Sequence, residues 1–438
     1  MNALQKIRNA RLVVFTIICM SLLFTLTNLI PLSLTFGVLI ILLPALLLGQ
    51  KTWHPILIIT SVLLFYFLCW TLIYSPSAFL DYSFYRRDGN VFATLLPIVL
   101  FGAMCFPMDV EKLAEYFVYI VSSINFIAAL GYKFFGIGQE LAGSCYCFMF
   151  LTHNAAGGFL AMLSALSLAL WLRNKTTPLL LIVIGNLTTL YMSDSRGSVL
   201  ALVGAVFMHY VLKERHIKKI MTLVVIITVV TISITYTLWD SYGRDLNYST
   251  ADMDSIEQNV QLNFERSYTF VDRVLFLWPR AVYLWLYSPV FGTGFGSYND
   301  LPYNLEGLEH IFMINIPKEY IYSDGHAHHT FFHILAETGL LGFLFTLLFL
   351  VTMHRFILSL NSSFLRSSLG LMFWVAVWSS MTEHRLFTPS QMLPFTILLG
   401  LTLGNERVKS VVLQNIKALK FPLQQYGFLK QIRGIVRK

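Results

Sequence analysis

The stretch SDGHAHHTFFHILAETGLLGFLF, residues 323–345, places four histidines at the start of a long apolar run. The run is typical of a helix that crosses a lipid bilayer, which takes about 20 residues. Imidazole groups are poorly suited to hydrocarbon. His326, His328, His329 and His333 therefore bind a metal, transfer protons or lie at the water interface, and the topology of the chain is needed to choose between these roles.

The composition indicates a polytopic helical membrane protein. The 438 residues are 56% hydrophobic and 12% charged, whereas soluble domains average roughly 25% charged residues. Apolar runs of spanning length recur along the whole chain. The first run follows the basic start MNALQKIRNAR, and because no small-residue cleavage site comes after it, we expect an uncleaved first helix.

We therefore expect an all-α integral membrane protein with about twelve transmembrane helices. An even number of spans puts both termini on one side of the membrane. The positive-inside rule assigns that side to the cytoplasm, because most of the 31 lysines and arginines then lie there. The predicted spans are residues 12–30, 32–49, 55–75, 91–106, 114–135, 147–172, 178–192, 197–213, 220–238, 331–353, 366–382 and 388–404.

These spans divide the chain into four parts. Residues 1–238 hold the first nine helices, and residues 239–330 form a large periplasmic loop. Residues 331–404 hold the last three helices, and residues 405–438 form a basic cytoplasmic tail. A connection of about 90 residues is usually functional, so the chemistry is expected on the outer side.

Arg196 lies in the first turn of a predicted span, behind the natural N-cap sequence SDS at 193–195. Its planar guanidinium suits a phosphate group, and the alternative is that it snorkels to the interface. The spans that begin near residues 147, 197 and 331 all run inward, so their N-termini gather at the outer face. Each N-terminus offers free N–H groups and a partial positive charge. A lipid pyrophosphate fits such a site.

Within the large loop, residues 272–288 are apolar enough to enter a membrane but carry Arg273 and Arg280. The two arginines are seven apart and hence share one face of a helix. We expect an interfacial helix whose cationic stripe faces the protein. The GTGFG at 292–296 lacks the strand and helix of a dinucleotide site, so it is predicted to form a tight turn after Pro289.

The histidines favour proton transfer over metal binding. His329 and His333 are four apart, a spacing that can chelate a metal on a helix. No carboxylate or cysteine ligand is adjacent, however, and the arginines would repel a cation. At a helix N-terminus the dipole keeps an imidazole neutral and able to accept a proton. His333 lies one turn deeper and is expected to be structural.

Four segments together resemble the O-antigen ligase family, which includes O-antigen polymerases and pilin O-oligosaccharyltransferases. DGHAHHTFFHILAETGLLG (324–342) resembles the family's H-x-H-N segment with its later E-x-G-x-x-G. SDSRGSVLAL (193–202) resembles its S/T-R-x-x-x-L/G segment. DRVLFLWPRAVYLWLYSPVFGTGFGSY (272–298) resembles R-x-x-x-W and P-x-x-G-x-G-x-G, and THNAAGGFLAMLSAL (152–166) resembles N-x-x-A-x-x-L. The segments occur in the family's order.

The resemblance implies a site that transfers a glycan from a polyprenyl diphosphate to an acceptor hydroxyl. The family's catalytic histidine maps to His328, and the arginines that hold the diphosphate map to Arg196 and Arg273. This chain has His329 where the family commonly has asparagine, so His329 stays the alternative base. A later acidic position maps to Glu383.

Three further residues are candidates for the same site. Arg280 is an additional candidate for the diphosphate, although it is not part of the family's pattern. Asn154 and His326 are candidate supporting residues, because they lie in the resembling segments.

We therefore predict an inverting O-antigen ligase that moves a glycan from undecaprenyl diphosphate to the lipid A–core at the periplasmic face of the bacterial inner membrane. No metal or other cofactor is expected, and the partners are the lipid-linked donor, the lipid A–core acceptor and membrane lipids, without nucleic acid. An O-antigen polymerase and a protein O-oligosaccharyltransferase are the alternatives within the family. A polysaccharide or lipid transporter or flippase is the alternative from another class, and its charges would lie near the middle of the membrane.

Overall fold

The computed structural model of the chain describes only part of the sequence. The described residues are 54–74, 76–80, 84, 88–104, 109–137, 145–150, 152–211, 273, 277–298 and 326–423. The spans predicted at 12–30, 32–49 and 220–238 lie outside these residues, and so does most of the predicted periplasmic loop.

Each predicted span that falls within the described residues is a helix. The helices are α3 (Pro55–Tyr74), α5 (Asn90–Met104), α6 (Val110–Phe135), α7 (His153–Asn174), α8 (Thr177–Met192), α9 (Arg196–Val206), α13 (Trp278–Tyr287), α16 (Thr330–Ser359), α17 (Ser363–Ser379) and α18 (Pro389–Leu423), with the short segments η1 (Pro76–Leu80) and η3 (Phe207–Val211).

Some boundaries differ from the predicted ones for local reasons. α7 begins later than predicted because Thr152 is its N-cap, with a hydroxyl that accepts a hydrogen bond from the Ala155 N–H at 3.2 Å. α6 begins after the N-cap Asp109, whose carboxylate accepts from the Lys112 N–H at 3.2 Å. α18 continues to Leu423, into the segment predicted as a tail.

The described helices have the surface of a membrane protein. Four of them are long and apolar enough to cross a bilayer, namely α3, α6, α7 and α16. On α16, Leu340, Leu344 and Leu348 follow each other at helical spacing and are 45%, 51% and 51% exposed. Such a stripe would be costly in water and suits contact with lipid. The full number of twelve spans remains an expectation.

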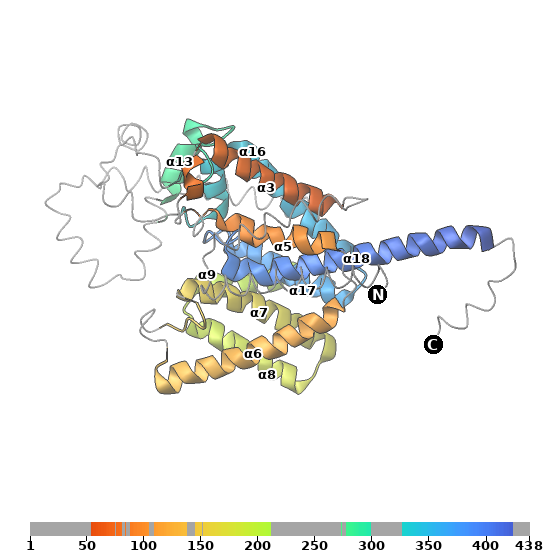
Figure 1. Cartoon of the computed structure of the whole chain (residues 1–438). Helices are drawn as coiled ribbons and strands as arrows, with labels where there is room; N and C mark the ends of the chain where they lie inside the picture. The colour runs from red at the N-terminus through yellow and green to blue at the C-terminus, as the bar shows by residue number, and fades with distance from the viewer. Residues whose placement is uncertain are drawn as a thin grey trace.

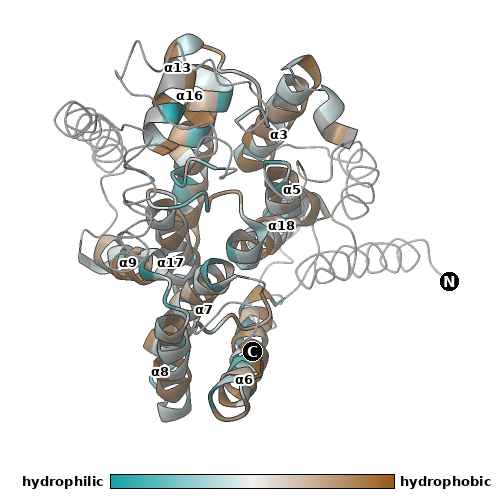
Figure 2. Cartoon of the chain, turned by 90° about the vertical axis from the view of Figure 1, so that its left-hand side faces the viewer, coloured by the Kyte–Doolittle hydropathy of each residue, from teal (hydrophilic) through white to brown (hydrophobic). Residues whose placement is uncertain are grey.

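The helices form a layered bundle around α7, α17 and α18 (Figure 1). α18 packs on α5 and α7, and α17 packs on α7 and α9. α3, α16 and α13 lie together on one side of this centre, and α6 and α8 lie on the other side against α7 (Figure 2). α5 is buried along nearly its whole length and packs against α18 and α3, so it joins the α3 side to the centre.

The starts of α7, α9 and α16 lie at one end of the bundle, as predicted. Ser195, which precedes α9, donates a hydrogen bond from its hydroxyl to the Asn154 side chain of α7 at 3.4 Å. The Thr330 N–H at the start of α16 donates to the Ser380 carbonyl after α17 at 2.9 Å. Gly197 of α9 lies against Thr382 in the same turn.

α16 is interrupted at Gly339, where φ is 63° and ψ is −164°. The segment after Pro289 fills the interruption. Gly292, Gly294 and Gly296 have φ values of 73°, 114° and 88°, which confirms the predicted glycine turn. Backbone hydrogen bonds replace the helical ones: Leu340 N–H to Pro289 C=O (2.8 Å), Leu341 to Val290 (3.1 Å), Thr293 to Ala336 (3.0 Å) and Gly294 to Glu337 (2.9 Å).

Replacement of Gly339 by alanine should destabilise the protein by about 2–4 kcal/mol. A side chain at this φ is strained, and its Cβ would lie 2.4 Å from the Val290 carbonyl. The measurement is unfolding of the purified protein in detergent, with Gly131→Ala in α6 as the control. At Gly131 the new Cβ meets only the Ile137 side chain at 3.3 Å, so this variant should keep or gain stability. Equal stability of the two variants would contradict the role given to the interruption.

Candidate active site

Side chains from distant parts of the sequence meet at Glu383, in the turn between α17 and α18. Arg273 donates from Nη2 to Glu383 Oε1 at 2.6 Å, and His328 Nδ1 lies 2.7 Å from Glu383 Oε2. Arg273 also donates from Nη1 to the Thr382 carbonyl at 3.0 Å. One carboxylate thus joins the residue predicted as the base to an arginine predicted to bind the diphosphate.

The start of α16 is locked onto this turn through Thr330. The Thr330 hydroxyl donates to the Glu383 carbonyl at 3.0 Å and accepts from the Arg385 N–H at 3.1 Å. His328, two residues earlier, has a φ of 46°, a left-handed conformation that is unfavourable for a residue with a side chain. Strain of this kind persists only where the surrounding structure enforces it, and the bonds of Thr330 do so here.

The Glu383 carboxylate is ionised over a wide pH range. Burial alone would raise the pKa of Glu383, but the hydrogen bond from His328 and the positive charges of Arg385, His328 and Arg273 lower it to about 2. An ionised carboxylate only accepts hydrogen bonds. His328 therefore carries a proton on Nδ1, which in the neutral ring leaves the lone pair on Nε2.

His329 has a different position, as the N-cap of α16. Its Nδ1 accepts a hydrogen bond from the Phe332 N–H at 3.3 Å. Asparagine, the residue common at this place in the family, is also a strong N-cap. The His329 ring stacks on Phe332 at a centroid distance of 4.1 Å and meets the Trp278 ring edge at 5.7 Å. Burial lowers the pKa of His329 to about 3, so the ring is neutral.

Arg196 begins α9 beside the same turn. An added Cβ at Gly197 would lie 3.0 Å from Thr382 Oγ1, so the two elements nearly touch. The Arg196 side chain is 71% exposed, as suits a group that meets a ligand from outside. Asn154, a predicted supporting residue, is linked to the start of α9 through Ser195.

Arg280 has partners other than those of Arg273, and its predicted role toward the diphosphate stays a prediction. α13 begins at Trp278, with a proline in its first turn, and both Arg273 and Leu277 before it have π-helical backbone. Arg280 is 3% exposed. Its guanidinium lies 4.5 Å from the centroid of the Tyr298 ring and donates to the Tyr298 carbonyl. Its place is structural, in the contact between α13 and the glycine turn.

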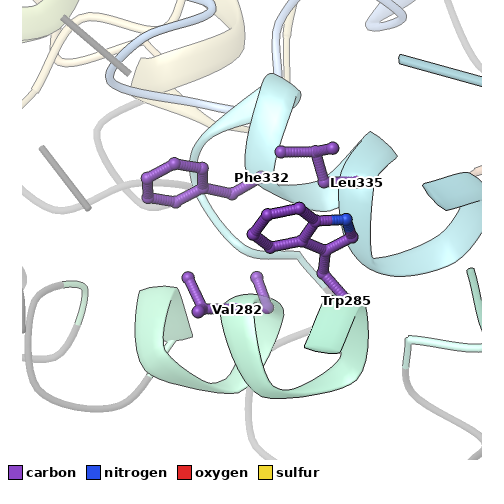
Figure 3. Close-up of a pocket in the computed structure, with 5 residues that line it drawn as sticks. Val282, Trp285, Phe332 and Leu335 are labelled. Carbon is purple, nitrogen blue, oxygen red and sulfur yellow. The ribbon is translucent and has the colours of Figure 1, made fainter. Parts of the chain in front are cut away.

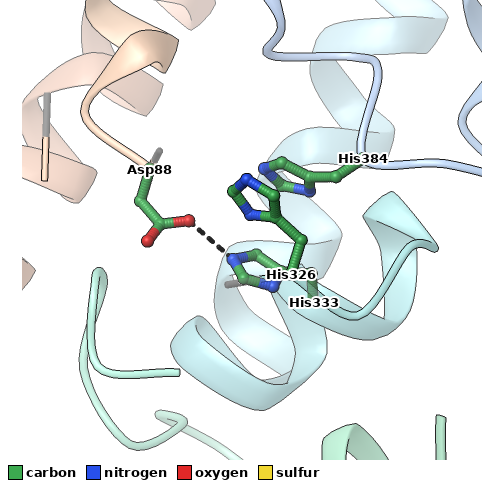
Figure 4. Close-up of side chains that lie close together, drawn as sticks. All are labelled: Asp88, His326, His333 and His384. Carbon is green, nitrogen blue, oxygen red and sulfur yellow. Dashed lines mark hydrogen bonds and ion pairs between the residues drawn. The ribbon is translucent and has the colours of Figure 1, made fainter. Parts of the chain in front are cut away.

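A second group of titratable side chains lies beside Glu383 (Figure 4). Asp88, His326, His333 and His384 each place one nitrogen or oxygen within 4.8 Å of the others. His333 Nε2 lies 2.7 Å from Asp88 Oδ1 and 3.4 Å from Glu337 Oε2. The His326 ring, predicted as a supporting group, stacks on His384 at 4.7 Å.

This second group fits a hydrogen-bond network better than a metal centre. Three imidazoles and a carboxylate are ligand types that zinc accepts. However, the Ala327 N–H donates to His333 Nδ1 at 3.5 Å, which leaves the ring proton on Nε2, facing Asp88. A metal would have to displace that proton. The pair considered from the sequence, His329 and His333, has separate partners.

A small apolar pocket borders the site between α13 and α16 (Figure 3). Its empty volume is about 160 Å³, and its lining residues are Ala281, Val282, Trp285, Phe332 and Leu335. Phe332 also carries the ring of His329. The first turns of α16 thus line the pocket, and Phe332 lies between it and the His329 ring.

Sequence reasoning gave no role to Asp88 or Arg385, which the structure places at the two groups. Both are buried, with 2% and 5% of their surface exposed. The signal that could have found them is a charged residue close to the end of a predicted span, where burial is costly without a function. Glu383 was found only through the family resemblance.

The low pKa of Glu383 predicts an acid-sensitive part of the stability. A carboxyl group whose pKa falls from 4.5 to about 2 on folding stabilises the protein above pH 4.5. That stabilisation is lost as the pH falls from 4.5 toward 2. Melting temperatures in detergent between pH 7 and pH 3 should therefore fall less steeply for Glu383→Gln than for the wild type. Parallel curves would show that the carboxylate is not held by these cations.

Comparison with known proteins supports the resemblance found in the sequence. A family model described as O-antigen ligase matches residues 179–347, a range that contains Arg196, Arg273 and His328. No curated protein matches the chain. The match confirms the resemblance carried by the motifs. Residues 179–347 of the chain are therefore similar to the O-antigen ligase family.

Proposed function

We propose that the protein is an O-antigen ligase, an inverting glycosyltransferase that moves a glycan from undecaprenyl diphosphate to a hydroxyl of the lipid A–core at the periplasmic face. The observation that supports this most directly is the Glu383 carboxylate, which contacts both His328 and Arg273. A base for the acceptor and a cation for the leaving group are thereby held by one group.

His328 is the proposed general base. The hydrogen bond from Nδ1 to the Glu383 carboxylate orients the ring and stabilises the positive charge that develops on it. The Nε2 lone pair accepts the proton of the acceptor hydroxyl as its oxygen attacks the anomeric carbon. The new bond forms on the face opposite the departing diphosphate, so the configuration at this carbon is inverted.

Arginines and helix N-termini stabilise the leaving group. A diphosphate leaves readily, so its negative charge has to be stabilised more than it has to be protonated. Arg273 and Arg196 are the proposed contacts, because guanidinium groups bind phosphate oxygens in pairs. The N-termini of α9 and α16 add their dipoles at the same end of the bundle. These groups supply positive charge without a metal ion.

The acceptor decides between the ligase and its relatives. The sequence predicts a single outer loop of about 90 residues, a length that is usually functional. This favours the ligase, since the resemblance implies two sizeable outer loops for a polymerase. The test is a strain that lacks the gene, examined on a lipopolysaccharide gel. Loss of glycan from the lipid A–core with accumulation of the lipid-linked polymer supports a ligase. Short glycans on the core indicate a polymerase, and an unglycosylated secreted protein indicates a protein oligosaccharyltransferase.

The two neighbouring histidines should respond differently to substitution. His328→Ala should lower glycan transfer by roughly 10²–10⁴-fold, because the base is lost. His329→Asn should keep activity, since asparagine also caps the helix. The measurement is complementation of a ligase-deficient strain, with membrane levels checked by immunoblot. If His328→Ala complements and His329→Asn does not, the base is assigned to the wrong residue.

Lysine should not replace the proposed diphosphate-binding arginines. Arg196→Lys and Arg273→Lys each keep the charge but lose the planar pair of donors, so transfer should fall by about tenfold or more. Arg173→Lys is the control, because Arg173 lies at the C-terminal end of α7 and pairs with Glu111 at 2.9 Å. Full activity of both site variants would show that only charge matters here.

A further inference from the structure

Arg385 is a buried cation in the turn that carries Glu383. The residue is 5% exposed. Its N–H donates to the Thr330 hydroxyl at 3.1 Å and to the Glu383 carbonyl at 3.0 Å, and its carbonyl accepts from the Thr388 N–H at 3.0 Å. The backbone of Arg385 is thus fixed on both sides, and His384 beside it packs into the second group of side chains (Figure 4).

The guanidinium of Arg385 feels the charge of Glu383 but makes no direct bond in the part of the chain that the structure describes. It donates no hydrogen bond and forms no ion pair there. The two oxygens of the nearest carboxylate, Glu383, are engaged by Arg273 and His328. A buried charge that is neither paired nor hydrogen-bonded is strongly unfavourable. An anion from outside the chain would remove this cost.

The surrounding charges favour the same conclusion. Arg273 pairs with Glu383, whose charge also acts on Arg385. Arg196 adds a third cation at the start of α9, with the Asp194 carboxylate 4.0 Å away. Burial lowers the pKa of Arg385, the Glu383 carboxylate opposes that change, and Arg273 adds to it. The local excess of positive charge suits an anion that carries more than one negative charge.

We infer that Arg385 is an anion-binding residue of the active site and that its ligand is the diphosphate group of a polyprenyl carrier. The choice of a diphosphate rests on the proposed function, whereas the choice of residue rests on its burial and its missing partner. The planar guanidinium would bind oxygens of one phosphate, while Arg273 and Arg196 bind the rest of the group.

The test measures binding rather than transfer. Full-length protein in detergent is titrated with farnesyl diphosphate, and the thermal shift gives the Kd. Arg385→Met should weaken binding about 10–100-fold, and Arg385→Lys should weaken it less. Without ligand, Arg385→Met should melt at the same or a higher temperature, because an unpaired buried charge has been removed. A residue with a merely structural role would show a lower melting temperature and an unchanged Kd.

The matched control is Arg366→Met. Arg366 lies in the first turn of α17 and donates from Nε to the Leu360 carbonyl at 3.0 Å, at the opposite end of that helix. This variant should bind farnesyl diphosphate as the wild type does. Farnesol, which has the same prenyl chain without the diphosphate, tests whether binding needs the anion and should not bind detectably. Inorganic pyrophosphate, which lacks the prenyl chain, tests whether binding needs the lipid. If it binds as tightly as farnesyl diphosphate, the assignment to a carrier lipid is overturned.

Two results would overturn the role of Arg385 itself. One is a wild-type Kd in Arg385→Met. The other is failure of both Arg385 variants to fold, which would make the residue structural. The proposed function is tested separately by the lipopolysaccharide of the deletion strain. Binding that depends on Arg385 in a strain with normal lipopolysaccharide would refute the ligase and keep the diphosphate site.

Discussion

A helix within a membrane has to satisfy its backbone groups inside the protein, and α16 meets this constraint at Gly339 by taking bonds from another segment. The glycine turn after Pro289 supplies carbonyls to Leu340 and Leu341 and N–H groups to the preceding turn of the helix. The segment that holds α13 is thereby tied to the helix that follows His328. The interruption of α16 therefore fixes the relative position of two parts of the active site that are far apart in sequence.

From this arrangement follows a division of work among the histidines at the start of α16. His328 faces the Glu383 carboxylate, His329 caps the helix, and His333 points one turn deeper to Asp88. Histidine thus fills three different roles at this helix start: contact with a carboxylate, capping of the helix and contact with a buried aspartate. The demands differ in burial and in partner, so the same imidazole accepts a backbone N–H in one place and donates to a carboxylate in another.

Hydropathy was sufficient to predict the described helices, because a run of about 20 apolar residues has few alternatives to a helix. The glycine turn was also predictable, since positive φ is a local property of glycine. The interruption of α16 was not, because it depends on bonds from a segment about 50 residues away in sequence. For the same reason, spacing alone could not predict that Arg273 contacts Glu383 while Arg280 contacts the Tyr298 carbonyl.

The charges explain why the site is assembled from several rigid elements. Cations on one flexible loop would move toward the nearest carboxylate and pair with it. Their electrostatic attraction for a ligand would then be weaker. Here Arg196 is fixed at the start of α9, Arg273 is held by Glu383 and the Thr382 carbonyl, and Arg385 is fixed by the backbone of its turn. Glu383 pairs with Arg273, and Asp194 lies 4.0 Å from Arg196, so two carboxylates face three arginines. The remaining positive charge is preorganised, which under the proposed function is the condition for stabilising a departing diphosphate more than water does.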